Sequence, residues 1–324
     1  MVQDRQDPKN SSSFLITVYA AGWSQPWRYP ENWKCLDRIN FAFAIPTPDG
    51  HLRPLDGKGS DPAVSEDYAR DLIAQAHAHE VKVLISVGGW SYHQIPLEAT
   101  FAEATENDGK INSLVRDIVT MAEDYGFDGV DIDWEYPRRA TAAANEKLLT
   151  LLGRKLKERG KLLTCAVYAG ASAKENGCDN LGNPVKDILD GFTPAAIEAV
   201  DNVNIMAYDG GDKELHAGYE WTVRGVEAWK SKCPAGKLVL GVPFYGRPGG
   251  SYRKLLEAEP KAKLCDTCLV GSSMAYYNGP DTIARKTRFA MEQGLGGMMA
   301  WEMSEDAPGE DSLLYQMAKT CGKI

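Results

Sequence analysis

Three acidic residues at alternating positions are the most informative feature of this 324-residue chain. Asp131, Asp133 and Glu135 stand in the segment 127–137, FDGVDIDWEYP, which is otherwise largely apolar. Side chains alternate between the faces of a β-strand, so a strand here puts all three carboxyls on one face, about 6.6 Å apart. Stacked acids are costly to bury and raise each other's pKa. We therefore favour the interpretation that the ladder provides a proton donor beside an ionised partner. The alternative is a polar strand that faces solvent.

Composition limits the partners of the chain. Hydrophobic residues make up 44% and charged residues 25%, as in a globular protein with a sizeable core. The net charge of −9 argues against nucleic acid or an anionic membrane as partner, and no apolar run reaches the ~20 residues of a membrane span. Residues 1–13 lack the apolar core of a secretory signal. The protein is therefore either cytoplasmic or a secreted protein whose signal has been removed, and we expect the second.

Cysteine and histidine spacing predicts no metal site. The seven cysteines are an odd number, so at least one is unpaired in a monomer, the state we expect. Cys165 lies in an apolar run and is predicted to be a buried thiol. Cys265 and Cys268 have CxxC spacing but no second ligand pair for zinc, and a local disulfide is favoured over free thiols. His77 and His79 would not face the same way on a helix and are expected at the surface.

Eight short apolar runs alternate with amphipathic segments along the chain. Apolar strands separated by helices indicate a parallel sheet covered on both faces, and eight such units predict an α/β fold, the (β/α)8 TIM barrel. A doubly wound open sheet is the competitor, but neither GxGxxG nor GxxxxGK[ST] is present. We expect a tail at 1–13 and a single domain at 14–324. The expected strands are 14–20, 38–44, 81–87, 129–135, 162–168, 200–207, 238–245 and 297–302. The expected helices are 65–79, 111–125, 143–158, 222–230, 281–293 and 312–318.

Polar and aromatic residues gather at the C-terminal ends of the expected strands. Barrel enzymes carry their active sites at this end, whereas random placement would scatter such residues along the strands. The residues concerned are Tyr19, Trp90, Asp133, Glu135, Tyr208, Asp209, Arg247, Trp301 and Glu302.

The acidic ladder also carries a resemblance to a known family. DGVDIDWE at 128–135 resembles the DxxDxDxE signature of the family 18 glycoside hydrolases, the chitinases and their relatives. SVGG at 86–89, MAYD at 206–209, FYGR at 244–247 and MMAW at 298–301 resemble further motifs of that family, in the expected order. The resemblance covers the chain from Phe14 onward and implies the same barrel. The interval 248–280 is too short for the full α+β domain that several chitinases insert between strands seven and eight.

The resemblance implies a substrate-assisted retaining mechanism. Glu135 is expected to protonate the leaving oxygen and later to activate water, while the acetamide carbonyl of the substrate attacks as nucleophile. Asp133 is expected to stabilise the cationic oxazolinium. Asp131 sits deeper and is expected to share a proton with Asp133. Tyr208 is expected to hold the acetamide in place, whereas Asp128 lies off the ladder face and is expected to be structural.

The remaining site residues are also assigned by resemblance, and no metal or organic cofactor is implied. They are Trp301 as the apolar floor, Trp90 as the platform on the leaving-group side, Asp209 and Arg247 as hydrogen-bond partners of the sugar, and Tyr19, Ser86 and Met206 as lining residues.

The sequence therefore predicts a chitinase that hydrolyses β-1,4-linked N-acetylglucosamine polymers or oligomers. The short interval after strand seven predicts an open cleft and endo-type cleavage. Two alternatives stay open. An endo-β-N-acetylglucosaminidase acting on N-glycan cores would share the ladder, although Trp90 and the WEYP segment at 134–137 favour a chitinase. A non-catalytic lectin on the same scaffold would typically lack the acid at Glu135.

Overall fold

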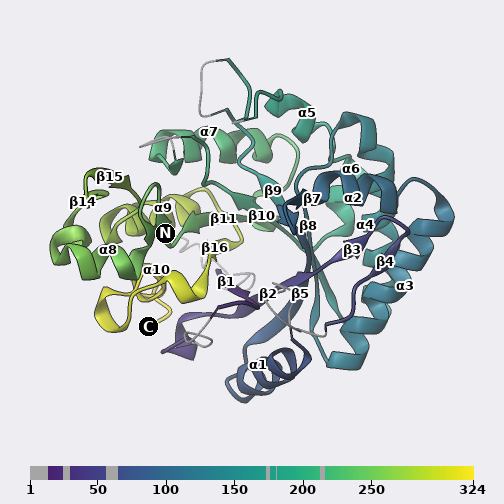
Figure 1. Cartoon of the computed structure of the whole chain (residues 1–324), viewed down its shortest axis with the longest axis horizontal. Coiled ribbons are helices and arrows are strands. Elements are labelled where there is room, and N and C mark those ends of the chain that lie inside the picture. Colours follow the sequence, from purple (N-terminus) through teal and green to yellow (C-terminus); the bar gives the residue numbers. More distant parts are fainter. Residues whose placement is uncertain (1–13, 25–29, 56–64, 173–175, 180, 212–215) are drawn as a thin grey trace, which may run out of the picture.

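Eight parallel strands close into a barrel, which confirms the predicted fold class (Figure 1). The computed structural model describes residues 14–24, 30–55, 65–172, 176–179, 181–211 and 216–324, so the expected tail at 1–13 lies outside the described residues. Each barrel strand pairs with the next one along the chain, and the last pairs with the first. The barrel strands are β1 (Leu15–Ala21), β2 (Arg38–Ala44), β5 (Lys82–Gly89), β8 (Gly129–Trp134), β9 (Leu162–Tyr168), β10 (Asn202–Met206), β11 (Leu238–Pro243) and β16 (Gly297–Trp301).

Helices cover the outside of the barrel (Figure 1). The six predicted helices are present, with ends that differ from the prediction by up to three residues: α1 (Glu66–Ala78), α3 (Asp108–Tyr125), α4 (Ala142–Lys157), α7 (Tyr219–Lys230), α9 (Pro280–Glu292) and α10 (Leu313–Thr320). Four further helices of five to eight residues were not predicted: α2 (Leu97–Ala104), α5 (Val185–Leu189), α6 (Pro194–Ala199) and α8 (Tyr252–Ala258). Too few turns form in these to show a clear apolar period.

The longest helix, α3, shows why the amphipathic segments fold as predicted. The side chain of Asn107 accepts a hydrogen bond from the backbone N–H of Lys110 and so caps the first turn. Buried residues recur at helical spacing from Ile111 to Ala122 and pack against the barrel. Gly126 ends the helix with φ +81°, a left-handed conformation that glycine adopts without a Cβ penalty.

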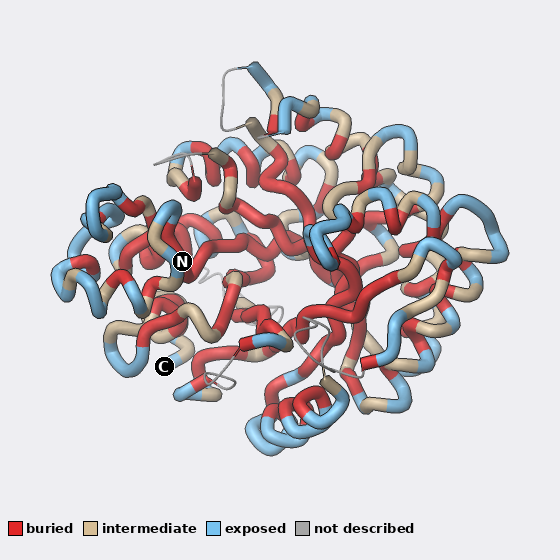
Figure 2. Tube along the Cα trace, in the orientation of Figure 1, coloured by how far each residue is buried: buried red, intermediate tan, exposed pale blue. Residues whose placement is uncertain are grey.

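The two faces of β8 separate the acids from the apolar residues. Val130, Ile132 and Trp134 pack outward into the core shared with the helices, where Trp134 stacks on Phe101 of α2. The acids point the other way, into the barrel, since Ser86 pairs with Asp131 and Gly88 with Asp133 in the parallel register. All the barrel strands are largely buried (Figure 2). The alternative of a solvent-facing polar strand is therefore excluded.

Asp128, at the entrance to β8, has a structural role as predicted. Its Oδ2 accepts the backbone N–H of Val83 at 2.8 Å and lies 2.8 Å from Nε2 of His77. His77 and His79 lie at the surface on and after α1, also as predicted.

The segment between β11 and α9 contains no full inserted domain, which confirms the prediction. It holds α8 and two small hairpins, β12 (Tyr245–Gly246) with β13 (Gly250–Ser251) and β14 (Thr267–Val270) with β15 (Ser273–Tyr276). Two further hairpins lie near the barrel mouth, β3 (Pro46–Thr47) with β4 (His51–Leu52) and β6 (Ser91–Tyr92) with β7 (Ile95–Pro96).

The predicted disulfide between Cys265 and Cys268 is wrong, because all seven cysteines are free thiols. Cys265 is exposed and its Sγ lies 3.0 Å from the carbonyl oxygen of Thr267, whereas Cys268 is buried on the inner face of β14. Cys165 is a buried thiol, as predicted.

Candidate active site

Asp131, the lowest carboxyl of the ladder, is fully buried and surrounded by hydrogen-bond donors. The hydroxyls of Tyr19 and Ser86 donate to its Oδ2 at 2.7 and 2.8 Å. The hydroxyl of Thr164 and the amide of Asn204 donate to its Oδ1 at 2.5 and 3.1 Å. Burial raises the pKa of Asp131, and these hydroxyl donors oppose the rise. Asp131 is thus a fixed structural centre of the barrel interior.

Asp133, the middle carboxyl, lacks this support. Its Oδ1 is buried and has no hydrogen-bond partner among the described residues. Burial, and then the charges of Glu135 and Asp131, raise the pKa of Asp133 well above its ordinary value. Within the described residues, no hydrogen bond joins Asp133 to Asp131. The two carboxyls are therefore not seen to share a proton directly, although this was expected.

Glu135, the upper carboxyl, faces the open end of the barrel. Burial raises its pKa to about 7; a hydrogen bond from Tyr136 opposes the rise and the charge of Asp209 adds to it. A carboxyl with this pKa is partly protonated near neutral pH and can act as a general acid. Asp133 and Glu135 share one site, where burial and like charge make it unfavourable for both to be ionised, so the pair keeps a proton near neutral pH.

Tyr208 follows the end of β10, two strands round the barrel from the ladder on β8. Its hydroxyl is 3.8 Å from Sδ of Met299. Burial, and then the charges of Asp133 and Glu135, raise the pKa of Tyr208 well above its ordinary value. The phenol therefore keeps its proton and is available as a hydrogen-bond donor.

A second polar cluster surrounds Asp209. Arg247 donates to the two carboxylate oxygens of Asp209 at 2.8 and 3.0 Å, and the Tyr245 hydroxyl donates to Oδ2 at 2.7 Å. Nδ1 of the buried His216 lies 3.2 Å from Oδ1 of Asp209 and also from its backbone nitrogen. Burial raises the pKa of Asp209, but the hydrogen bonds from His216 and Arg247 outweigh it and hold the pKa well below its usual range. Asp209 is therefore ionised at neutral pH.

Aromatic rings form an apolar wall beside the acids. Phe43 stacks on Trp301, with ring centroids 5.6 Å apart and planes inclined by 14°. Trp23 lies 6.1 Å from Phe43 and 6.4 Å from Trp301. Tyr19 packs against Trp301 from below, at 5.4 Å. Since Trp23 and Trp90 are each about half exposed, they offer ring faces to a ligand.

These groups line one cleft of about 530 Å³ at the C-terminal end of the strands. Eight of the predicted site residues border it: Asp133, Glu135, Tyr208, Asp209, Arg247, Trp301, Trp90 and Met206. The other three, Asp131, Tyr19 and Ser86, lie beneath it as one hydrogen-bonded group and do not line it.

Several residues of the site were not singled out in the sequence, among them Trp23, Phe43, Tyr136, His216 and Tyr245. Tyr245 belongs to the FYGR segment, and Tyr136 follows Glu135 directly, so chain neighbourhood was an available signal for these two. Trp23 and Phe43 stand at or just after the ends of β1 and β2, where an aromatic residue is a reasonable candidate in a barrel. His216 had no such signal, because its contact with Asp209 joins residues seven positions apart that share no helix or strand.

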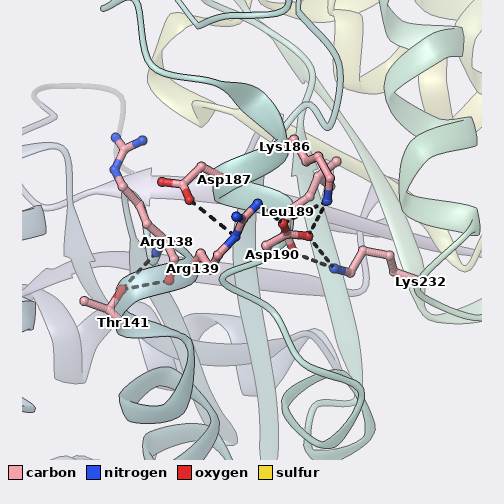
Figure 3. Close-up of polar contacts among 8 residues, drawn as sticks. All are labelled: Arg138, Arg139, Thr141, Lys186, Asp187, Leu189, Asp190 and Lys232. Atoms are coloured by element: carbon pink, nitrogen blue, oxygen red, sulfur yellow. Dashed lines mark hydrogen bonds and ion pairs between the residues drawn. The ribbon is translucent and has the colours of Figure 1, made fainter.

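The segment after the ladder is fixed by an ion-pair cluster (Figure 3). Asp190, which follows α5, accepts from Nη2 of Arg139 at 2.6 Å and from Nζ of Lys186 at 2.8 Å. Lys232, beyond α7, lies 3.9 Å from the same carboxylate. Hydrogen bonds from Lys186 and Arg139 lower the pKa of Asp190. The cluster ties residues 138–141 to α5 and to the end of α7.

The sequence of this chain is similar to those of known glycoside hydrolases. The family model described as Glycosyl hydrolases family 18 matches residues 15–306. The chain is 29% identical to Chitinase 1 of Aphanocladium album, over 72% of this chain and 64% of that protein. It is 27% identical to Endochitinase 1 of Metarhizium robertsii, over 75% and 66%. The chain thus spans slightly less than two thirds of these curated relatives.

Solved structures show the same architecture. The family 18 chitinase ChiB of Flavobacterium johnsoniae superposes with a TM-score of 0.76 at 26% identity, covering 96% of this chain and 94% of that one. A chitinase of Bacteroides thetaiotaomicron superposes with a TM-score of 0.74 at 25% identity, covering 96% and 97%.

Proposed function

This chain belongs to glycosyl hydrolase family 18, and we propose that it is a chitinase that cleaves β-1,4-linked N-acetylglucosamine chains with retention of configuration. One observation carries the proposal. Glu135 has a pKa of about 7 and stands above the buried Asp133, at the border of a cleft with an aromatic wall. A proton donor, a second carboxyl beside it and a ring surface for sugar C–H groups are what substrate-assisted hydrolysis requires.

In the proposed mechanism Glu135 protonates the glycosidic oxygen as the bond to the anomeric carbon breaks. The carbonyl oxygen of the substrate's own acetamide attacks that carbon and forms a cyclic oxazolinium ion. Asp133, next to Glu135 on the ladder, stabilises the positive charge on the acetamide nitrogen. Glu135, now ionised, removes a proton from water. The water attacks the anomeric carbon from the side that the leaving group occupied and opens the oxazolinium ring. The displacement occurs twice, so the configuration is retained.

The other residues of the cleft position the sugar. The protonated Tyr208 donates a hydrogen bond to the acetamide oxygen and holds it for attack. Trp301 supports the apolar face of the reacting sugar, and Trp90 supports the leaving-group side. Asp209 and Arg247 bind sugar hydroxyls. They are held rigid by each other, so little side-chain entropy is lost when substrate binds.

We further propose endo-type cleavage by a monomer that acts outside the cell. Between β11 and α9 the chain adds only α8 and two hairpins beside the cleft, which leaves it open for a long chain. Every proposed site residue comes from one chain, so a second copy is not required. Chitin is a polymer too large to enter a cell, which favours an extracellular enzyme. None of the described helices is both long and apolar enough to cross a membrane.

The test is hydrolysis of N-acetylglucosamine tetramer, pentamer and hexamer, with early products and their anomers followed by proton NMR. We expect β-anomers first, in a mixture of product sizes. Release of disaccharide alone from the start would contradict endo action. Cleavage of an N-glycopeptide core in place of these oligomers would move the protein to the endo-β-N-acetylglucosaminidases. Binding without cleavage of either would make it a lectin.

A further inference from the structure

A lysine is completely buried in the outer layer of the barrel. The side chain of Lys286, in α9, has no exposed surface, which is rare for lysine unless it is paired with an acid. Within the described residues it forms no ion pair. Its Nζ donates to two neutral acceptors, the carbonyl oxygen of Ala217 at 2.8 Å and Oδ1 of Asn278 at 2.8 Å.

The number of acceptors around Nζ of Lys286 fits a neutral amine in a fixed position. Two acceptors satisfy the two protons of a neutral amine, whereas an ammonium would bring a third proton and a charge. Burial lowers the pKa of Lys286 to about 7, and only the charge of Asp266 acts against this. A buried group of this kind is costly and persists where it holds something else in position.

The segment that Lys286 holds consists of His216 and Ala217, which precede α7. Asn278 also donates to the carbonyl oxygen of Ala217, at 3.1 Å, so two side chains meet on this one atom. The residue before it is His216, which is 1% exposed. The backbone of His216 accepts from Gly210 at 3.1 Å and its ring contacts Asp209. Lys286 is therefore two contacts away from Asp209.

Asp209 needs such support. Its φ is +54°, in the left-handed region, which is uncommon for a residue with a Cβ although aspartate adopts it more readily than most. The neighbours that keep it there are His216 on one side and the pair Tyr245 and Arg247 on the other. If the segment of His216 and Ala217 shifts, the Asp209 carboxylate that orients Arg247 shifts with it.

We propose that Lys286 is a positioning residue for the Asp209–Arg247 end of the cleft, and that it acts through Ala217 and His216. It touches no substrate. The proposal rests on the proposed function only as far as the cleft binds oligosaccharide. It implies a specific coupling between an outer helix and one end of the cleft.

The main experiment is a double-mutant cycle in kcat/KM on N-acetylglucosamine hexamer, using Lys286→Met and Arg247→Met. We expect Lys286→Met alone to lower kcat/KM about 10-fold, mostly through KM, and to change it less than 2-fold when Arg247 is already Met. Equal factors in both backgrounds would overturn the proposal. Arg288→Met, on the exposed side of the same helix, is the control and is expected to leave kcat/KM unchanged. Lys286→Gln keeps one donor and serves if the Met variant does not fold.

A second readout does not need activity. The chain has five histidines, so ring signals of His216 can be resolved by NMR after histidine labelling. We expect Lys286→Met to shift the His216 signals and Arg288→Met to leave them in place. Unchanged His216 signals in the Lys286 variant would overturn the proposal. If Lys286→Met shifts the His216 signals as expected but the wild-type protein does not cleave the hexamer, the proposed function fails while the positioning role stands.

Discussion

Two groups of carboxyls border the same cleft and have opposite electrostatics. On β8, burial raises the pKa of Asp133 and Glu135, and Asp133 has an oxygen with no partner among the described residues. After β10, Asp209 is held by Arg247, Tyr245 and His216, and its pKa is well below the ordinary value. The residue types are similar and the positions are close, so the difference comes from the partners that the fold supplies.

The comparison separates two uses of an acid. A carboxyl without donors can hold or release a proton near neutral pH, which suits it for chemistry but makes its charged form unfavourable in the folded protein. A carboxylate with a guanidinium, a phenol and an imidazole stays ionised and rigid, which suits it for orienting a ligand. Asp131 is a third case, because its four neutral donors satisfy its oxygens without supplying a counter-charge.

The largest expected effect comes from removing the proton donor. Glu135→Gln keeps the shape of the side chain but cannot release a proton, so we expect turnover of N-acetylglucosamine hexamer to fall about 10²- to 10⁴-fold. Binding of the hexamer should survive, because the ring surfaces and Asp209 are unchanged. Kinetics and isothermal titration with the hexamer measure the two quantities separately.

A matched control shows whether the loss of turnover depends on the position of the carboxyl or only on its raised pKa. Burial also raises the pKa of Glu305, to about 8, but Glu305 does not line the cleft. We expect Glu305→Gln to change turnover less than 3-fold. Turnover by Glu135→Gln that is comparable to wild type would contradict the assignment of the acid.

Stability should change in opposite directions in the two groups. The pKa of Glu135 is above its ordinary value of 4.5, so its contribution to folding is lost as the pH rises from about 4.5 to about 7. At about 1.4 kcal/mol for each pKa unit, Glu135→Gln should stabilise the protein by about 3–4 kcal/mol at pH 8 and by little at pH 4.

For Asp209 the sign is reversed. Its pKa is lowered, so its contribution is present above the ordinary value near 3.8 and is lost as the pH falls below it. Asp209→Asn should destabilise the protein at pH 8 by only about 1 kcal/mol, because the side chain is 43% exposed. Urea unfolding of both variants at pH 8 and pH 4 measures these differences. Changes of the same sign at pH 8 would refute the contrast.

The sequence predicted one of these groups better than the other. The ladder follows from strand alternation within six residues, so its position on the inner face of β8 could be predicted from local pattern alone. Asp209 and Arg247 were named by resemblance, but their pairing needs two strands and a loop to come together. His216 and the contact of Lys286 with Ala217 were not predicted, because they depend on loop path and helix packing. The CxxC disulfide was also wrong, since spacing alone does not decide whether two thiols form a bond.

The smallest expected effect connects the two groups. The charge of Asp209 helps to raise the pKa of Glu135, and Glu135 must be protonated to act as an acid. The kcat/KM of the wild-type enzyme should therefore fall about tenfold for each pH unit above about 7. Asp209→Asn removes the negative charge and leaves that of Arg247, so this fall should begin at a lower pH, by about 0.3 to 1 pH unit.

Arg247→Met is the matched opposite. It leaves the charge of Asp209 without its guanidinium, and the bonds from Tyr245 and His216 keep Asp209 ionised, so the fall in kcat/KM should begin at a higher pH than in wild type. Both variants lose a contact to substrate, and loss of a contact lowers kcat/KM at every pH without moving the profile. Opposite displacements would therefore report the charge of Asp209 acting on Glu135. Displacement of both profiles in the same direction would mean that the two groups of carboxyls are not electrostatically coupled.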